Sequence, residues 1–301
     1  MKSKYQVYQV DSFTSELFTG NPAGVVPNAE GLTETQMQKI ARELNNSETA
    51  FIIPSTEKEY DVWVRFFSPT MEVPICGHAT VAAHYIRALE NTLGSCRVLQ
   101  KTGAGILPVD IIKENDNYKI IMTQGKIEFE EPFKKETSGA IANALHLTPD
   151  DIDPKCPMQI VSTGHSKVMI GINTQSKLDS LKPDMQALAN LSKDIKCNGF
   201  FVFTFNSNEE DILTKGRMFA PAIGINEDPV TGNANGPLGA YIVKHKLHSF
   251  NGRTFSFKGK QGETIGRTGT IEVEVDTENG EPVQVRIGGR AVVVFKTEIS
   301  I

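Results

Sequence analysis

The chain has 301 residues, of which 39% are hydrophobic and 22% charged, and its formal net charge is −5. Its length suits about two domains, and its acidic balance disfavours nucleic acid and anionic membranes as partners, because both attract basic surfaces. Four scattered cysteines are too few for a disulfide framework and favour a reducing, cytoplasmic location. The first residues lack a signal peptide's apolar core, and the longest apolar run, at 291–295, is far shorter than a membrane span.

The start of the chain predicts a strand, a helix and a second strand. Alternating residues at 5–10 are typical of a strand, and a dense turn signal follows at 20–24. Thr33 and Gln36 have the spacing of a helix capping box, and apolar residues recur behind them on one helical face. Asn45 is suited to end that helix, since asparagine tolerates the left-handed conformation. A strand is expected over 47–53.

The rest of the chain predicts strands around two helices that are rich in small residues. One such helix is expected at 79–89 and the other at 234–246, and small residues on most of their faces indicate burial. A third helix is expected near 185–192, and the charged segment 126–136 is expected to be a connector. Strands are expected near 61–67, 97–101, 107–112, 118–123, 158–162, 168–170, 200–205, 270–275, 283–287 and 291–295.

One pattern occurs in both halves of the chain. RFFSP at 65–69 matches RMFAP at 217–221, and EVPICGHA at 72–79 matches EDPVTGNA at 227–234. Self-similarity at this length predicts a duplicated domain rather than a solenoid. Gly77 and Gly232 each precede a helix, whose first N–H groups are unpaired and carry partial positive charge, so both helix starts suit an anion. If the halves face each other, both starts point into one cleft and hold a small carboxylate.

Motifs for cofactors and metals are not found. The glycines at 103–105 and 262–269 fit neither a dinucleotide fingerprint nor a phosphate-binding loop. His78 and His84 do not share a helix face, and His245 and His248 have no third ligand at a useful distance. We therefore expect no metal and no nucleotide cofactor.

With these residues in view, the chain resembles the PhzF (phenazine biosynthesis protein) family, and more distantly diaminopimelate epimerase and proline racemase. The resemblance spans the full length and is carried by NPAGVV at 21–26, SETAF at 47–51, CGHAT at 76–80 and EDPVTGNA at 227–234. Within the family, the chain is most similar to the YddE type of uncharacterised bacterial isomerases.

The resemblance implies an α+β fold of two pseudo-symmetric domains, each a curved, mostly antiparallel sheet wrapped around a central helix. The domains are expected at 1–125 and 126–301, with a strand at about 291–301 packing onto the first. The resemblance also implies an active site in the cleft between the domains, chemistry without a cofactor, and a homodimer.

The resemblance assigns acid–base catalysis to Glu48, with His78 and Asp228 as further catalytic residues. Glu48 lies where a polar turn becomes an apolar strand, and loss of hydration there would favour its protonated acid. His78 begins a helix, whose positive end disfavours imidazolium. The Asp228 carboxylate is expected to bind a substrate amino group or to orient His78. The alternative is that it simply caps a turn. The residues expected to bind substrate are Cys76, Gly77, Ala79, Thr231, Gly232, Asn233 and Ala234.

These observations predict an isomerase of a biosynthetic process that moves a proton on a small cyclic or amino-substituted carboxylate. One alternative is a dehydratase or epimerase that uses Cys76 as a single base. A two-thiol racemase is disfavoured, because the repeat places Thr231 opposite Cys76 and threonine is too weak an acid. The other alternative is a metabolite-binding relative without catalysis, since Asn233 stands where the family has serine.

Overall fold

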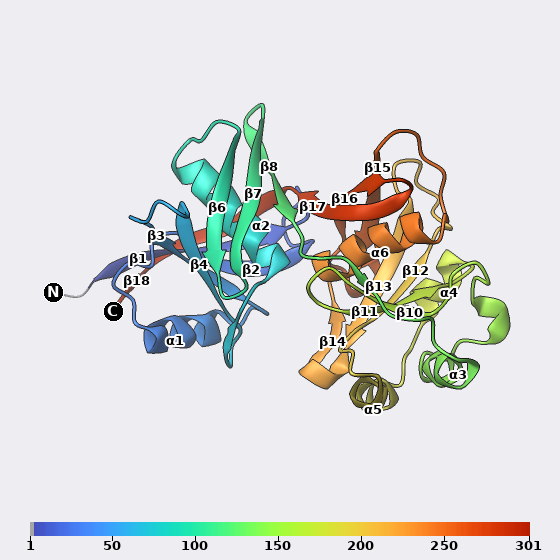
Figure 1. Cartoon of the computed structure of the whole chain (residues 1–301). Helices are drawn as coiled ribbons and strands as arrows, with labels where there is room; N and C mark the ends of the chain where they lie inside the picture. The colour runs from blue at the N-terminus through green and yellow to red at the C-terminus, as the bar shows by residue number, and fades with distance from the viewer. Residues whose placement is uncertain (1–2) are drawn as a thin grey trace. The chain divides into compact units, whose positions relative to one another are not determined.

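The computed structural model describes residues 3–301 and has an α+β fold. The chain forms two compact units (Figure 1). Unit 1 comprises the residues up to Thr123 together with Gly288–Ile301, and unit 2 is the continuous segment Gln124–Ile287. The chain thus leaves unit 1 after Thr123, two residues before the boundary expected from the sequence, and returns to it at Gly288. No helix in residues 3–301 is long and apolar enough to cross a membrane.

Unit 1 contains one long sheet and two helices. The strands pair in the order β18, β1, β2, β3, β4, β6, β7, β8, and the β2–β3 and β4–β6 pairs are parallel whereas the others are antiparallel. The short strand β5 pairs with β4. The bounds are β1 Lys4–Ser12, β2 Asn21–Val26, α1 Glu34–Leu44, β3 Thr49–Pro54, β4 Val62–Phe67, β5 Glu72–Val73, α2 Gly77–Glu90, β6 Cys96–Thr102, β7 Gly105–Glu114, β8 Asn117–Thr123 and β18 Ala291–Ser300.

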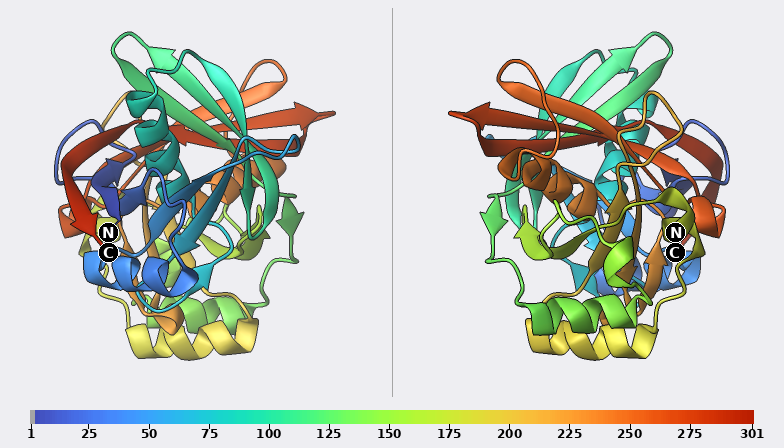
Figure 2. Two further views of the ribbon diagram at one scale, coloured as in Figure 1. Left: turned by 90° about the vertical axis from the view of Figure 1, so that its left-hand side faces the viewer. Right: turned by 90° about the vertical axis from the view of Figure 1, so that its right-hand side faces the viewer.

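The sheet of unit 1 curves around α2. This helix contacts β1, β2 and β18 at one end of the pairing order and β7 and β8 at the other, which requires the sheet to wrap it. Figures 1 and 2 show α2 held in this way. Every residue of α2 from His78 to Ile86 is buried, as its small residues predicted. Helix α1 begins at the predicted Thr33–Gln36 capping box, ends at left-handed Asn45, and packs outside the sheet.

Unit 2 repeats this arrangement with two additional helices. Its strands pair in the order β9, β10, β11, β12, β13, β15, β16; β11–β12 and β13–β15 are parallel, and the other pairs are antiparallel. Helix α6 contacts strands from both ends of this order, and its residues Ala234–Val243 are all buried. The bounds are β9 Glu128–Phe129, α3 Lys135–Ala144, β10 Gln159–Ser162, β11 Lys167–Gly171, α4 Gln175–Ser180, α5 Met185–Ile195, β12 Phe200–Thr204, β13 Thr214–Ala220, β14 Ile225–Asp228, α6 Gly232–Lys244, β15 Thr254–Gln261, β16 Gly269–Glu278 and β17 Glu281–Gly289.

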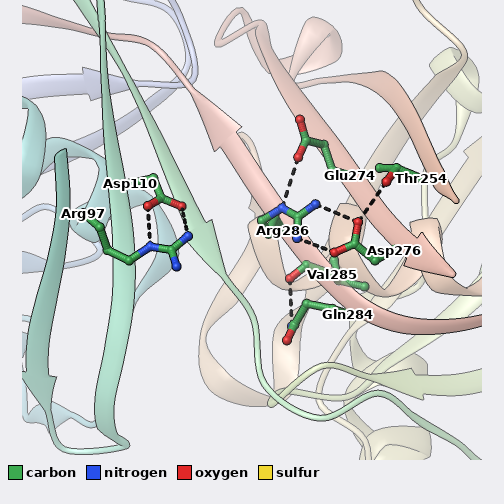
Figure 3. A network of polar contacts seen from close by, with 8 residues as sticks. All are labelled: Arg97, Asp110, Thr254, Glu274, Asp276, Gln284, Val285 and Arg286. Carbon is green, nitrogen blue, oxygen red and sulfur yellow. Dashed lines mark hydrogen bonds and ion pairs between the residues drawn. The ribbon is translucent and has the colours of Figure 1, made fainter. Parts of the chain in front are cut away.

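Charged side chains also bridge neighbouring strands at the surface (Figure 3). In unit 1, Arg97 on β6 forms a bidentate ion pair with Asp110 on β7, at 2.7 and 2.9 Å. In unit 2, Arg286 on β17 donates to Glu274 and Asp276 on β16. The Arg97 side chain is 63% exposed, so its pair contributes little free energy of unfolding, whereas the Arg286 pairs are partly buried.

Equivalent ion pairs in the two units show that the repeat is structural. In unit 1, Arg65 on β4 binds Glu72 on β5, with Nη2 2.6 Å from Oε2. In unit 2, Arg217 on β13 binds Glu227, with Nη2 2.7 Å from Oε2. The repeat in the sequence matches both members of the pair. The two units therefore share strand order, helix position and an arginine–glutamate ion pair.

The expected connector at 126–136 is partly wrong. It contains the short strand β9, and helix α3 begins at its end. Helices α3 and α4 and strand β15 were also not predicted. Helix α3 carries little amphipathic pattern and no side-chain N-cap, and α4 is short, so neither leaves a clear signal in the sequence.

Candidate active site

Three side chains that can exchange protons meet at the start of α2. Glu48 Oε2 lies 3.3 Å from His78 Nε2 and 3.4 Å from Cys76 Sγ. Cys76 Sγ also lies 3.4 Å from His78 Nδ1. The His78 and Glu48 side chains are only 9% and 18% exposed. This half-enclosed cluster joins a carboxylate, a thiol and an imidazole, so a proton can pass among them without bulk water.

Backbone structure holds each member of this cluster in place. Glu48 directly precedes β3, and its carbonyl oxygen accepts a hydrogen bond from the Gly24 amide at 3.3 Å. Cys76 is the N-cap of α2 in extended conformation, and its side chain does not cap the helix. The His78 carbonyl oxygen accepts from Ser12 Oγ at 2.8 Å, and Ser47 Oγ lies 3.2 Å from His78 Nε2. The first turn of α2 therefore has no side-chain cap, which suits an anionic ligand.

The start of α6 in unit 2 carries a different polar cluster. Thr231, its N-cap, donates through Oγ1 to Asp228 Oδ2. Gln261 Nε2 donates to the Asp228 carbonyl oxygen at 2.8 Å and to Thr231 Oγ1 at 3.0 Å, while the Thr231 amide donates to Gln261 Oε1. This cluster fixes Asp228 and Thr231 but contains no thiol or imidazole.

The remaining predicted binding residues lie in the first turns of the two helices. Gln124 Nε2 donates to the Gly232 carbonyl oxygen at 3.0 Å and lies 3.4 Å from Asn233 Oδ1. A Cβ at position 232 would lie 2.4 Å from Ile287 Cδ1, so a larger residue there would require that side chain to move. Gly77 and Ala79 follow Cys76 in α2, and Ala234 lies in α6.

The structure thus brings Glu48, Cys76 and His78 together in unit 1 and joins Asp228 to Thr231 in unit 2. Sequence reasoning missed Gln124 and Gln261, which lie far along the chain from the residues that they bind. Gln261 ends β15, a strand that was itself not predicted. The four cysteines are thiols rather than members of disulfides, and of these Cys76 belongs to the cluster.

The comparisons with known proteins first define the fold class. A hydroxyproline epimerase from Agrobacterium vitis, 12% identical, aligns with a TM-score of 0.64 over 100% of this chain and 94% of that one. A Bacillus anthracis protein of the PhzF family aligns with a TM-score of 0.89 at 31% identity, over 99% of this chain and 100% of that one. The predicted fold of curved sheets around central helices, shared with these epimerase-like proteins, is confirmed.

The family of phenazine biosynthesis-like proteins matches residues 10–297, and the chain belongs to this family. It is 64% identical to an uncharacterised isomerase of Clostridium acetobutylicum and 53% identical to the uncharacterised isomerase YddE of Escherichia coli K12, over 99% of each chain. The trans-2,3-dihydro-3-hydroxyanthranilate isomerase of Pseudomonas chlororaphis is 28% identical over 94% of this chain and 95% of its own. The predicted enzyme class, an isomerase, is confirmed by these relatives.

Proposed function

We propose that this isomerase works without a cofactor and moves a proton on a small carboxylate, with Glu48 as the acid–base group. The observation that carries the proposal is the position of the Glu48 carboxylate, 3.3 Å from His78 Nε2 beside the uncapped start of α2. A base and an anion-stabilising helix end lie together there, as proton abstraction from carbon requires.

In the proposed reaction, Glu48 removes a proton from a carbon atom of the substrate. The electron pair moves into the adjacent unsaturated system, and the N–H groups of Gly77–Ala79 stabilise the negative charge that develops. Glu48 then returns the proton to a different atom, so the product is an isomer and no atom is gained or lost. His78 contacts Glu48 and Ser47 and would bind the substrate or relay the proton.

We assign Asp228 to the recognition of a substrate amino group, and the amides at Gly232–Ala234 to a carboxylate. The amino-substituted, cyclic substrate named for the Pseudomonas chlororaphis relative supports this class of compound. We also propose a cytoplasmic homodimer that binds neither nucleic acid nor membranes. The acidic composition supports the second part of this proposal.

Cys76 remains a second candidate for the base, because its Sγ atom contacts both Glu48 and His78. Such an enzyme would be a dehydratase or epimerase with one thiol base. A metabolite-binding protein without turnover is the third candidate, since Asn233 replaces the family's serine and lies beside Gln124.

Deuterium exchange tests the proposal. The protein would be incubated in deuterium oxide with cyclic and amino-substituted carboxylates, including trans-2,3-dihydro-3-hydroxyanthranilate and trans-4-hydroxy-L-proline, and mass spectrometry would detect deuterium on carbon. We expect exchange by the wild type, none above background by Glu48→Gln, and wild-type exchange by the control Glu57→Gln, which changes an exposed glutamate of unit 1. Equal exchange by Glu48→Gln would reject Glu48 as the base. Binding without any exchange would favour the third candidate.

A further inference from the structure

The strand registers show which residue of unit 2 corresponds to Glu48. In unit 1, Thr49 on β3 pairs with Phe67 on β4. In unit 2, Phe200 on β12 pairs with Phe219 on β13, and the repeat matches Phe67 with Phe219. Thr49 and Phe200 are therefore equivalent. Glu48 precedes the first and Gly199 precedes the second, so unit 2 has glycine where unit 1 has its carboxylate.

The strand parallel to β12, which is β11, carries a lysine beside Gly199. Thr49 pairs with Gly24 on β2, and Phe200 pairs with Val168 on β11. Lys167 precedes Val168 and is thus the counterpart of Ala23. A Cβ atom built at Gly199 would lie 2.3 Å from Cδ, 2.8 Å from Cε and 3.5 Å from Nζ of Lys167. The lysine side chain therefore fills the space into which the Glu48 equivalent would project.

Lys167 is an unusual lysine because it is buried with few partners. It is 8% exposed, and its Nζ makes one hydrogen bond, to the Ser166 carbonyl oxygen at 3.1 Å. Within residues 3–301, no carboxylate lies within 4.0 Å of this ammonium. The other buried lysine of unit 2, Lys215, has ion pairs of 2.9 Å with Glu209 and with Glu263. An ammonium uses three donors, so Lys167 keeps two for a ligand.

The functional candidate Asp228 interacts electrostatically with Lys167. Burial lowers the pKa of Lys167, while the interactions with Cys197 and Asp228 oppose that shift. Asp228 is in turn bonded to Thr231 at the start of α6. A buried cation, a carboxylate and the positive end of a helix therefore lie in one region of unit 2.

We propose that Lys167 is a substrate-binding residue, and that its ammonium and Asp228 together recognise the carboxylate and amino groups of an amino acid. The proposal rests on the proposed function for the role of Asp228. It narrows the substrate class to zwitterions, because a cation and an anion at neighbouring positions match the two charges of an amino acid. It also explains why a costly buried cation is present without an ion-pair partner.

Stability measurements separate this role from a structural one. Lys167→Met keeps the length of the side chain and removes its charge, so we expect its free energy of unfolding in urea to equal or exceed that of the wild type. The matched control Lys215→Met removes the buried partner of Glu209 and Glu263, which then retain Lys260 at 2.8 and 3.7 Å, and should be less stable. If Lys167→Met is destabilised as much as Lys215→Met, Lys167 is a structural group and the proposal is wrong.

Binding measurements test the recognition itself. Calorimetric titration would compare L-proline, trans-4-hydroxy-L-proline and 2-aminocyclohexanecarboxylate with the corresponding amines and the corresponding acids. We expect the wild type to bind at least one amino acid more tightly than both of its analogues, and Lys167→Met to lose at least tenfold in affinity. Lys167→Arg should retain more affinity than Lys167→Met. Gly199→Ala should lose affinity, because its Cβ displaces the lysine.

Equal affinity of Lys167→Met and wild type, or no preference of the wild type for any amino acid, would overturn the proposal. Glu57→Gln, the exposed control in unit 1, keeps Lys167 and should bind as the wild type does. If Glu48→Gln still exchanges deuterium while Lys167→Met loses binding, the proposed base is wrong and the role of Lys167 stands. If Lys167→Met binds amino acids as the wild type does while Glu48→Gln loses deuterium exchange, the proposed proton transfer stands and only the role of Lys167 is wrong.

Discussion

Each unit begins a buried helix with glycine, yet the side chains around the two glycines differ. At the start of α2 in unit 1 lie a carboxylate, a thiol and an imidazole, from Glu48, Cys76 and His78. At the start of α6 in unit 2, Thr231 and Gln261 hold Asp228 by hydrogen bonds. The shared strand order supplies the same frame in both units. The difference teaches that one strand order can carry a cluster of carboxylate, thiol and imidazole in one unit and a hydrogen-bonded carboxylate without thiol or imidazole in the other.

The largest expected effect tests this division directly. We expect Glu48→Gln to lower the rate of deuterium exchange about a thousandfold, because an amide cannot accept the proton. Asp228→Asn should instead raise KM for amino-substituted substrates and change kcat less, because it weakens binding in both the ground and transition states. Steady-state kinetics on any substrate found by exchange would measure both. The reverse order of effects would place the base in unit 2.

The ion pairs Arg217–Glu227 and Arg65–Glu72 occupy equivalent positions, so their contributions to the free energy of unfolding can be compared. Arg217 and Glu227 are each 10% exposed, and Arg217 also donates to the Leu178 and Leu181 carbonyl oxygens at 3.0 Å. Glu227→Gln leaves this arginine buried without its carboxylate, so we expect a loss of about 3 to 4 kcal/mol in the free energy of unfolding.

The matched variant in unit 1 should cost much less. Glu72 is 38% exposed, and its partner Arg65 retains a second carboxylate, Glu34, at 2.8 Å. Glu72→Gln is therefore expected to cost less than about 1 kcal/mol. Urea unfolding measures both variants. Similar losses would show that burial of the ion pair does not distinguish the units.

A third prediction concerns a buried histidine that only unit 1 has. His84 in α2 aligns with Gly239 in α6, and it is fully buried with Nε2 3.0 Å from Gln100 Oε1. Its Nδ1 atom has no hydrogen-bond partner within residues 3–301. Burial, and secondarily the Arg87 charge, lower its pKa from 6.5 to about 4, against the opposing Gln100 hydrogen bond.

The sign of the pH effect follows from this shift. Between pH 6.5 and 4 the unfolded chain binds a proton that the folded chain excludes, so stability is full above pH 6.5 and falls as the pH is lowered through this window. We expect a loss of about 3 kcal/mol from this group. Urea unfolding at a series of pH values should show that His84→Gln lacks this component. An unchanged pH profile in the variant would contradict the prediction.

The smallest expected effect concerns the thiol. If Glu48 is the base, Cys76→Ser should change the exchange rate less than tenfold, because a hydroxyl can still contact Glu48 and His78. Cys76→Ala should also remain active. A loss as large as that of Glu48→Gln in both variants would make Cys76 the base and support the one-thiol alternative.

The sequence was most informative where the signal is local or repeated. The capping box at Thr33, the end of α1 at Asn45 and the two small-residue helices follow from short patterns, and each is present. The matched segments also predict the equivalence of Arg65 and Arg217. The contact of Cys76 with Glu48 had no such signal, because it depends on how β3 meets the start of α2.

The second polar cluster was harder to foresee for the same reason. Gln261 reaches Thr231 from a strand that was not predicted, and no turn or cap motif surrounds it. Lys167 lies outside the repeated segments, so its relation to Glu48 becomes visible only through the pairing of β11 with β12. Strand register is a long-range property, and a single sequence does not encode it in any short pattern.

The return of the chain to unit 1 through β18 sets an order for folding during synthesis. Unit 2 is one continuous segment, and all of its residues are synthesised before Gly288–Ile301. Strand β18 pairs with β1 along the whole of both strands, from Lys4 with Ser300 to Ser12 with Ala291. Before β18 is in place, the backbone N–H and C=O groups on the β18 side of β1 have no hydrogen-bond partner. An open strand edge of this kind can pair with other chains. The nascent protein therefore depends on its last strand to close the edge of its first.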